Sequence, residues 1–359
     1  MKIKEIVITS AKRTAIGSLN KSLRNVQSYD LCAAVIKDLL KDSNLEVKEI
    51  DEVILGQVLT AGLGQNPARQ AAIKSGIPKE KPAYIVNQVC GSGIRSVASG
   101  FQSILSGDSK IIIAGGQESM SRAPHALHIR DGKKLGNTEM IDTMIKDGLW
   151  DAFHGYHMGV TAENVATKFQ VTRKDQDKFA LKSQEKAMQA QRNNKFSNEI
   201  IDFKIKLKNS EIDFNIDEHP RKEISLESLE RLKPVFKKDG TVTAGNASTI
   251  NDGASALILM SADKALELGI TPLAKINSFA DAAQEPEWFT TAPAKAVPIA
   301  VAKAGLVMSD NEAKKLGLEK LVSIKSWASC GVEPALMGTG PIPASKKALE
   351  LAGWTIKDV

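Results

Sequence analysis

Apolar and polar positions follow two alternating periods along the first 120 residues of the chain. Apolar residues that recur every three to four positions predict helices at 29–41 and 92–105. Asn66-Pro67 predicts another helix start, because asparagine caps helices and proline suits the first turn. Apolar, β-branched stretches predict strands at 3–10, 52–59, 83–89 and 110–114. This β-α-β alternation predicts an α/β fold with a largely parallel sheet.

The pattern changes between about residues 120 and 239, where the chain becomes polar and rich in helical periodicity. Its clearest element is an amphipathic helix predicted at 175–192. We interpret this stretch as a loop domain inserted over the sheet. Regular alternation returns with a predicted strand at 255–261 and a predicted helix at 262–268, which indicate a second core domain.

The C-terminal part of the chain contains an internal repeat. At an offset of 48 positions and without gaps, residues 260–305 align with residues 308–353, with identities far above chance. Each copy has the pattern of a helix, a strand, a loop and a helix. The two copies either stack as structural repeats or join two versions of one segment.

Composition describes an ordinary soluble chain, with 42% hydrophobic and 25% charged residues among 359. No apolar run approaches the length of a membrane span, and the N-terminus lacks the layout of a signal peptide, so we expect a cytoplasmic protein. The net charge of +6 is diffuse. It suits a polyanionic ligand, although a plain solvated surface explains it more simply, and nothing indicates nucleic acid.

Three cysteines are widely spaced, and neither a CxxC pair nor a histidine cluster offers metal-ligand spacing. Such a sparse set is typical of reduced thiols. Cys32 falls on the apolar face of the helix predicted at 29–41, which indicates a core position. Cys330 aligns with Ala282 of the other repeat copy, so we interpret it as structural.

The strongest chemical signal is Cys90 within the sequence NQVCGSG (87–93), between a predicted strand and a predicted helix. The dipole and free N–H groups at a helix N-terminus stabilise a thiolate. The neighbouring glycines let backbone N–H groups approach an acyl group closely. This arrangement suits a covalent acyl-cysteine intermediate. The alternative, a small buried apolar side chain, stays open on spacing alone.

This cysteine segment resembles the active-site motif of the thiolase family, specifically acetyl-CoA C-acetyltransferases of the short-chain biosynthetic type. Further stretches resemble signatures of the same family in the same order, namely AKRTAIG (11–17), GGQESMS (115–121), HGYHMG (154–159), TAGNAS (243–248) and NDGA (251–254). The resemblance runs from residue 1 to about 305 and again over 306–353.

The resemblance implies a thiolase-like layered α-β-α-β-α core with an inserted loop domain and an incomplete second core domain. The implied units are an N-terminal core domain at 1–119, a loop domain at 120–245, the start of the C-terminal core domain at 246–305, and a repeat of the 260–305 segment at 306–359. The stretch 119–136 resembles the tetramerisation loop of the family, which implies a homotetramer, with a dimer as the minimum.

The resemblance also implies roles for individual residues. Cys90 would attack the thioester of a first acetyl-CoA. His157 and Met158 would lie at the acyl pocket, where His157 shapes the pocket or donates a hydrogen bond rather than acting as the principal base. Leu149 would line the pantetheine tunnel, and Ser248 would bind the pantetheine amide. Core packing for Leu149, a turn for Ser248 and a structural role for a lone histidine are the simpler alternatives.

Three more residues are implied at the two ends of the ligand. Arg221 and Ser228 resemble contacts to the adenosine-phosphate end of coenzyme A. Arginine suits this role because its guanidinium matches phosphate oxygens. A solvated surface charge is the simpler reading of Arg221. Phe289 falls at the acyl-pocket position in the first repeat copy, where the second copy has Met337.

The family takes further catalytic groups from three C-terminal signatures, Asn-Glu-Ala-Phe, Gly-His-Pro and Cys-x-Gly, and none is found here. Ala313 of an Asn-Glu-Ala sequence is followed by Lys314, and His219 lies too early. We therefore expect acetyl-CoA C-acetyltransferase ancestry, in fatty acid metabolism, with strongly impaired turnover. The reaction would convert two acetyl-CoA to acetoacetyl-CoA and CoA, with no separate cofactor.

Two other functional classes are weighed against this one. A non-catalytic thiolase-like protein would bind coenzyme A or assemble with complete thiolases without turnover. A ketoacyl synthase would use the same nucleophilic cysteine on carrier-protein substrates, but the resemblance at the coenzyme contacts disfavours it. Genomic rearrangement, a truncated paralogue and an artificial construction all remain explanations of the repeat.

Overall fold

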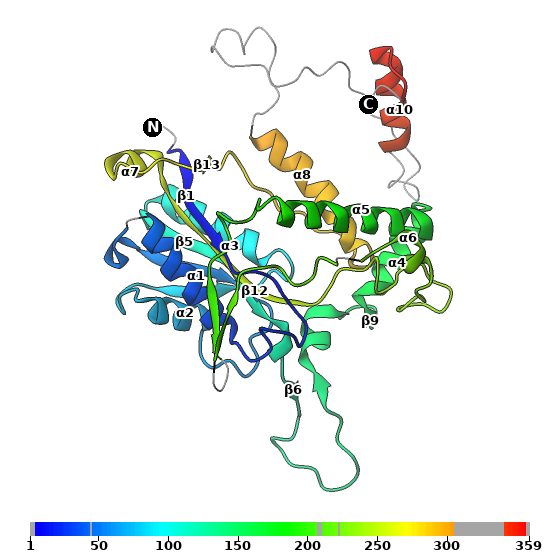
Figure 1. Ribbon diagram of the computed structural model, residues 1–359, viewed down its shortest axis with the longest axis horizontal. Helices are drawn as coiled ribbons and strands as arrows, with labels where there is room; N and C mark the ends of the chain where they lie inside the picture. Colours follow the sequence, from blue (N-terminus) through cyan, green and yellow to red (C-terminus); the bar gives the residue numbers. More distant parts are fainter. Residues whose placement is uncertain (1–3, 44, 207–209, 222, 305–340, 357–359) are drawn as a thin grey trace.

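A single mixed sheet organises the part of the chain that the computed structural model describes, which is residues 4–43, 45–206, 210–221, 223–304 and 341–356. Its main path runs β13-β1-β12-β5-β3-β4, and β2 pairs with β12 (Figure 1). The strands are β1 (Ile6–Arg13), β2 (Gly17–Ser18), β3 (Glu52–Gly56), β4 (Ala83–Val86), β5 (Ile111–Ser119), β12 (Asn251–Ser261) and β13 (Ala274–Lys275).

The strand directions differ from the prediction of a largely parallel sheet. β3 is parallel to both β4 and β5, as the β-α-β pattern predicts. β12 lies between β1 and β5 and is antiparallel to both. The prediction is therefore wrong for this half of the sheet. β12 follows β5 only after a long insertion, so no helical crossover forces it to run parallel.

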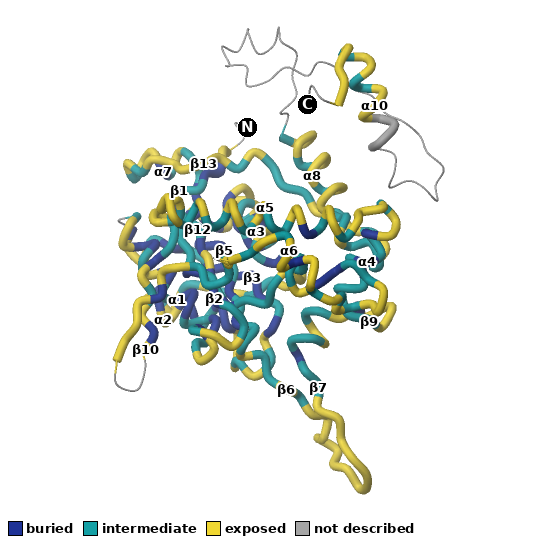
Figure 2. Tube along the Cα trace, turned by 45° about the vertical axis from the view of Figure 1, so that its right-hand side comes forward, coloured by how far each residue is buried: buried dark blue, intermediate teal, exposed yellow. Residues whose placement is uncertain are grey.

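Helices cover both faces of the sheet. α1 (Ser28–Ser43) and α2 (Pro67–Ser75) pack on one face, and α3 (Ser92–Ser106) packs on the other. Along β5, Ile113 joins the core beneath α1 and α2, while Ile112 joins the core beneath α3. Burial on both faces explains the continuous apolar run of this strand (Figure 2).

The helix predictions for α1 and α3 are confirmed to within two residues. Asn66 caps α2 as predicted, accepting a hydrogen bond from the backbone N–H of Arg69 at 3.1 Å. Cys32 is fully buried in α1, where burial raises the pKa of its thiol to about 12. Its predicted core position is confirmed, and this thiol stays protonated and unreactive at neutral pH.

An insert segment, residues 120–250, connects β5 to β12. In Figure 1 its helices lie on the opposite side of the molecule from α1 and α2, and the loop between β6 and β7 extends away from the body with exposed residues (Figure 2). Its elements are η2 (Met120–Arg122), β6 (His125–Ala126), β7 (Ile141–Asp142), η3 (Met144–Leu149), β8 (Trp150–Asp151), β9 (Tyr156–His157), α4 (Met158–Lys168), α5 (Arg173–Arg192), β10 (Phe203–Lys206), β11 (Glu211–Phe214) and α6 (Leu226–Glu230). The long helix predicted at 175–192 is confirmed as α5.

The structure describes nearly all of the first repeat copy but only the end of the second. The first copy contains α7 (Ala262–Glu267), β13, η4 (Pro286–Thr291) and α8 (Ala292–Lys303), the predicted order of helix, strand, loop and helix. α10 (Pro341–Ala352) is the counterpart of α8 in the second copy, whose remainder, with Cys330, lies outside the described residues. The predicted domain boundaries stay predictions, although the sheet itself continues past residue 245 into β12.

Two further contacts fix the start of α3 on the sheet. A Cβ atom added to Gly56 at the end of β3 would overlap the backbone of Ser92. The buried hydroxyl of Ser96 lies 2.7 Å from the carbonyl oxygen of Gly115 and accepts a hydrogen bond from its N–H at 2.9 Å. The helix therefore approaches β3 and β5 at backbone distance. No helix in the described ranges is long and apolar enough to cross a membrane.

We predict that Gly56→Ala destabilises the fold by about 3 kcal/mol or more, because the overlap is with backbone that cannot rotate away. Gly93→Ala, where an added Cβ meets nothing within 4 Å, is the matched control and should cost nothing. Denaturant unfolding measures both. Equal stability of the two variants would contradict the close approach.

Glu118, near the end of β5, holds the loop that follows β3. Its carboxylate accepts hydrogen bonds from the N–H groups of Val58 at 2.9 Å and Leu59 at 3.1 Å. Burial is the largest influence and raises the pKa of Glu118 to about 7, against the lowering effect of these two bonds and with a further rise from Asp252. The loop is thus held by a carboxyl group that titrates near neutrality.

We predict a pH-dependent loss of stability at this position. The folded pKa lies above the unfolded value of about 4.3, so the contribution of Glu118 is full below the unfolded pKa and is lost as pH rises to about 7. The unfolding free energy of Glu118→Gln relative to wild type should therefore rise by about 3 kcal/mol between pH 4 and 8. Glu80→Gln, at an exposed position, is the control. A difference that is flat with pH would refute the assignment.

Candidate active site

Cys90 lies exposed in the turn between β4 and α3, where the sequence predicts it. Val89, directly before it, has a φ of 48°, a left-handed conformation that is costly for a β-branched residue. Hydrogen bonds hold this turn closed. The N–H of Gly91 donates to the carbonyl of Gln88 at 3.0 Å, and the Ser92 hydroxyl donates to the carbonyl of Val89 at 2.6 Å. Strain of this kind, imposed by the surrounding structure, is typical of functional sites.

The chemistry available at this turn is nucleophilic. The thiol is accessible, and Gly91 is the N-cap of α3, so the partial positive charge of the helix start faces the turn. That charge favours an oxyanion that develops on an acyl group attached to the sulfur.

Asp281 ties this turn to a distant segment of the chain. Its carboxylate accepts a hydrogen bond from the side chain of Gln88 at 3.0 Å and pairs with Arg95 of α3 at 3.0 Å. Asp281 was not predicted as a site residue from the sequence. No local signal identifies it, because its partners lie far away in the sequence.

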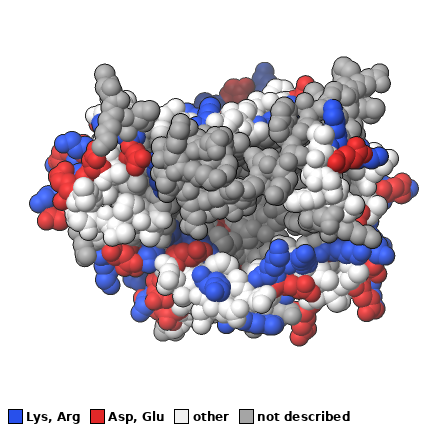
Figure 3. Space-filling model, turned by 90° about the horizontal axis from the view of Figure 1, so that it is seen from above, with Lys and Arg blue, Asp and Glu red and all other residues white. Residues whose placement is uncertain are grey.

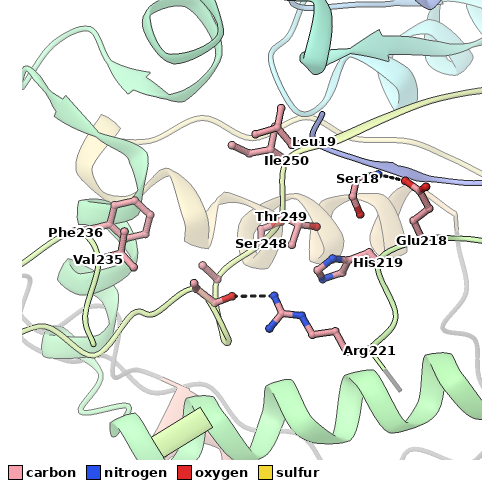
Figure 4. A pocket seen from close by; sticks show the side chains of 12 residues that line it. Ser18, Leu19, Glu218, His219, Arg221, Val235, Phe236, Ser248, Thr249 and Ile250 are labelled. Atoms are coloured by element: carbon pink, nitrogen blue, oxygen red, sulfur yellow. Dashed lines mark hydrogen bonds between the residues drawn. The ribbon is translucent and has the colours of Figure 1, made fainter. Parts of the chain in front are cut away.

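A cavity of about 490 Å³ lies on the side of the molecule formed by the insert segment, and it brings together two of the predicted ligand contacts, Arg221 and Ser248 (Figure 4). The guanidinium of Arg221 donates to the carbonyl of Ala244 at 3.4 Å. The lining residues are Ser18, Leu19, Glu218, His219, Arg221, Val235, Phe236, Ala244, Ala247, Ser248, Thr249 and Ile250.

Two buried carboxylates position one wall of this cavity. Glu163 of α4 accepts hydrogen bonds from the N–H groups of Thr241 at 2.8 Å and Val242 at 2.7 Å. Asp177 of α5 accepts one from the side chain of Asn246 at 2.9 Å. Residues 241–246 are therefore fixed to α4 and α5, and the wall residues Ala247 and Ser248 come directly after them in the chain.

His157 connects the cavity to the start of α4. Its Nδ1 accepts a hydrogen bond from the N–H of Gly159 at 3.0 Å, and burial lowers the pKa of its imidazole, so the neutral ring carries its proton on Nε2. The ring stacks on Phe236 at 4.7 Å, and a Cβ on Gly159 would overlap that aromatic ring. Because Phe236 lines the cavity, His157 lies directly behind that wall, and Met158 follows it in the chain as the first residue of α4.

Phe236 is a second residue of the site that was not predicted from the sequence. A usable signal exists, since it is the single aromatic residue between Phe214 and Phe279, in a polar stretch. An isolated aromatic side chain in such a stretch usually packs against something specific.

The remaining predicted residues are not among those that line the cavity. Leu149 is half-buried at the end of η3, and Phe289 is half-buried in η4. Ser228 is exposed and belongs to a capping box of α6, where its N–H donates to the Ser225 hydroxyl at 3.1 Å. This local role accounts for Ser228 without a ligand.

The charge around the cavity favours anions on one side. Burial, and secondarily Arg221, lowers the pKa of His219, so the guanidinium is the permanent cation of the lining. Gln184 of α5 accepts a hydrogen bond from the N–H of Arg221 at 2.9 Å, which places this helix beside the cavity. The outer face of α5 carries exposed lysines at four-residue spacing, Lys174, Lys178, Lys182 and Lys186. Basic side chains also form a band on the face seen in Figure 3.

Comparison with protein families matches most of the chain. The family model described as thiolase, N-terminal domain, matches residues 6–263, and the model described as thiolase, C-terminal domain, matches residues 318–359. The second match shows a C-terminal thiolase domain in the residues that were assigned above to an appended repeat copy, and this corrects that assignment. Of this region, only α10 and the residues up to 356 are described.

Individual relatives agree with the family models. An acetyl-CoA acetyltransferase of Rhizobium meliloti is 55% identical over 300 residues, covering 84% of this chain and 76% of the relative. One from Paracoccus denitrificans is 52% identical over 299 residues, covering 83% and 76%. The crystal structure of the Bacillus anthracis acetyl-CoA acetyltransferase matches with a TM-score of 0.74 and 35% identity, covering 99% of this chain and 78% of that chain. The chain therefore belongs to the thiolase family of acyltransferases.

Proposed function

We propose that this protein catalyses the reversible condensation of two acetyl-CoA molecules to acetoacetyl-CoA and CoA, with the acetyl group carried on Cys90. The observation that supports this most is the exposed Cys90 in a strained turn at the start of a helix. It occurs in a chain that is about half identical to proteins named acetyl-CoA acetyltransferase.

The reaction has two halves at this sulfur. The Cys90 thiolate attacks the acetyl carbonyl, the new carbon–sulfur bond forms, and CoA leaves as a thiol after taking up a proton. The α-carbon of a second acetyl-CoA, once deprotonated, then attacks the acetyl-cysteine and releases Cys90 with acetoacetyl-CoA. The start of α3 stabilises the negative charge that develops in both halves.

The cavity that contains Arg221 and Ser248 is the proposed site for the coenzyme A portion of the substrate. Arg221 and the exposed lysines of α5 supply positive charge for its phosphates, and such charge both binds a polyanion and raises its rate of encounter. Ser248 offers a hydroxyl for an amide of the pantetheine arm. His157, Met158 and Phe289 are proposed to surround the acyl end.

The level of turnover stays a prediction. Acid–base assistance is worth roughly 10²–10⁴-fold in rate, so the comparison with a relative measures whether this chain has it. A thiol-release assay with acetoacetyl-CoA and CoA, run beside the Rhizobium meliloti relative, measures it. Turnover comparable to that of the relative would contradict the impairment.

Assembly and location are also proposals. The loop between β6 and β7 extends from the body and overlaps the stretch that resembles a tetramerisation loop, which supports a homotetramer of this chain. The cytoplasmic location is proposed from the sequence alone. Light scattering of the purified protein measures the assembly, and a monomer would contradict it.

We predict that incubation with radiolabelled acetyl-CoA leaves an acetyl group on Cys90, because of the two cysteines in the described residues Cys90 is the exposed one. Cys90→Ser should carry no thioester-linked label. Cys32→Ser is the matched control and should label like wild type, because Cys32 is buried and its raised pKa keeps it protonated. Mass spectrometry of digested protein locates the label. Undiminished labelling of Cys90→Ser would overturn the proposal, and CoA binding without any label would support the non-catalytic alternative.

We predict that Arg221→Gln raises KM for CoA about tenfold with little change in kcat, because a lost charge-assisted hydrogen bond weakens ground and transition states alike. Arg231→Gln is the control, since Arg231 is exposed on the chain just after α6 and pairs with Glu227. Steady-state thiolysis kinetics measure both. A KM for CoA that is unchanged in Arg221→Gln would remove Arg221 from the coenzyme site.

A further inference from the structure

The segment between β13 and η4 crosses the beginning of α3 and connects the Cys90 turn to η4. Asp281 holds it to Gln88 and Arg95, as described above. Phe279 packs edge-to-face on Phe101 of α3, with ring centroids 5.6 Å apart. Further along, the side chain of Gln284 donates to the carbonyl of Trp288. A displacement of η4 would therefore change the surroundings of the nucleophile.

η4 docks on the insert segment through side chains rather than through backbone pairing. It packs against α4, and the ammonium of Lys168 at the end of that helix lies 3.9 Å from the ring centroid of Trp288. At the other end, Nε2 of His154 lies 3.7 Å from a carboxylate oxygen of Glu287. Both contacts are partly exposed, so each is weak enough to change with conditions.

Asp151 fixes the orientation of the His154 ring. Its buried carboxylate accepts hydrogen bonds from the N–H groups of Phe153 at 2.8 Å and His154 at 3.1 Å, and it lies 3.0 Å from Nδ1 of His154. Burial alone would raise the pKa of Asp151, but these bonds prevail and lower it. The carboxylate is therefore ionised, and Nδ1 of His154 carries a proton that it donates to Asp151.

The charge of His154 then decides its contact with Glu287. When the ring is cationic, Nε2 also carries a proton and attracts the Glu287 carboxylate. When the ring is neutral, Nε2 presents a lone pair to that carboxylate and the attraction is lost. Histidine is the side chain whose charge changes near neutral pH. Asp151, Glu287 and Tyr156, whose ring stacks on His154 at 5.5 Å, are the titratable groups that face it in the described structure.

The two sides of this contact carry the residues proposed for the acyl pocket. Glu287 lies two residues before Phe289 in η4. His154 lies in the turn that leads to His157 and Met158 at the start of α4. We propose that protonated His154 is a positioning residue that latches η4 to this turn through Glu287 and so limits the acyl length that the pocket accepts. This inference rests on the proposed thiolase function.

The experiment measures kcat/KM for thiolysis of acetoacetyl-CoA and of 3-oxohexanoyl-CoA from pH 6 to 9. Taking the ratio of the two kcat/KM values cancels any pH dependence that is common to both substrates. In wild type the preference for the shorter substrate should be greatest at pH 6 and about three- to fivefold smaller at pH 9, because a partly exposed ion pair with histidine requires a cationic imidazole, which low pH favours.

Variants test whether the pH dependence of this ratio comes from the contact between His154 and Glu287. His154→Asn and Glu287→Gln should each show a ratio that does not vary with pH and equals the high-pH value of wild type, and the double variant should match either one. Glu285→Gln is the matched control, because Glu285 is exposed two residues earlier and should leave the wild-type profile intact. A wild-type profile in Glu287→Gln, or the same change in Glu285→Gln, would overturn the latch.

A second measurement separates this inference from the proposed function. Hydrogen exchange at pH 6 of the peptide that contains η4 should be several-fold faster in His154→Asn and Glu287→Gln than in wild type and Glu285→Gln. Equal exchange in all four proteins would overturn the latch whatever the kinetics show. If wild type turns over neither substrate, the proposed function fails, and the exchange rates alone decide whether the latch exists.

Discussion

The close approach of α3 to the sheet is the constraint on which the rest of this structure depends. Gly56 has no side chain, so the backbone at Ser92 can lie directly against the end of β3. Ser96 then joins the helix to Gly115 of β5 through its buried hydroxyl. With the helix fixed at this distance, the turn before it must close tightly, and Val89 takes up a left-handed conformation that leaves Cys90 exposed. Backbone packing of this kind positions the sulfur more rigidly than side-chain contacts could.

The second part of the site is assembled by charged groups that do not react. Glu163 and Asp177 are buried on helices of the insert segment and accept hydrogen bonds from the stretch around residues 241–246. Buried carboxylates require such partners, so the wall of the cavity and the helices stabilise each other. Asp281, before η4, and Glu287, within it, make more exposed contacts with Arg95 and His154. Long-range ion pairs also hold the insert segment to the sheet, as Arg13 of β1 pairs with Glu199 and Asp217.

Local sequence patterns predicted the elements better than their pairing. The periodicity of α1 and α3 and the apolar run at the start of β5 are properties of neighbouring residues, and the structure confirms them. The polar second half of β5 was not predicted as strand. It pairs with β12 through Gly115 and as far as Ser119, and that pairing comes from a strand more than a hundred residues away. The antiparallel direction of β12 has the same origin, since a long connection leaves either direction open.

The sequence by itself determined the family, the layers of helix and strand, and the position of Cys90 at a strand–helix junction, because periodicity, capping residues and turn chemistry act between residues that are close along the chain. Only the tertiary structure decided that Arg221, Ser248 and Phe236 share one cavity and that His154 faces Glu287. These residues lie far apart along the chain, and their distances depend on how the stretches that carry them fold against one another. No local pattern predicts these contacts, because they depend on the tertiary packing of stretches that are distant along the chain.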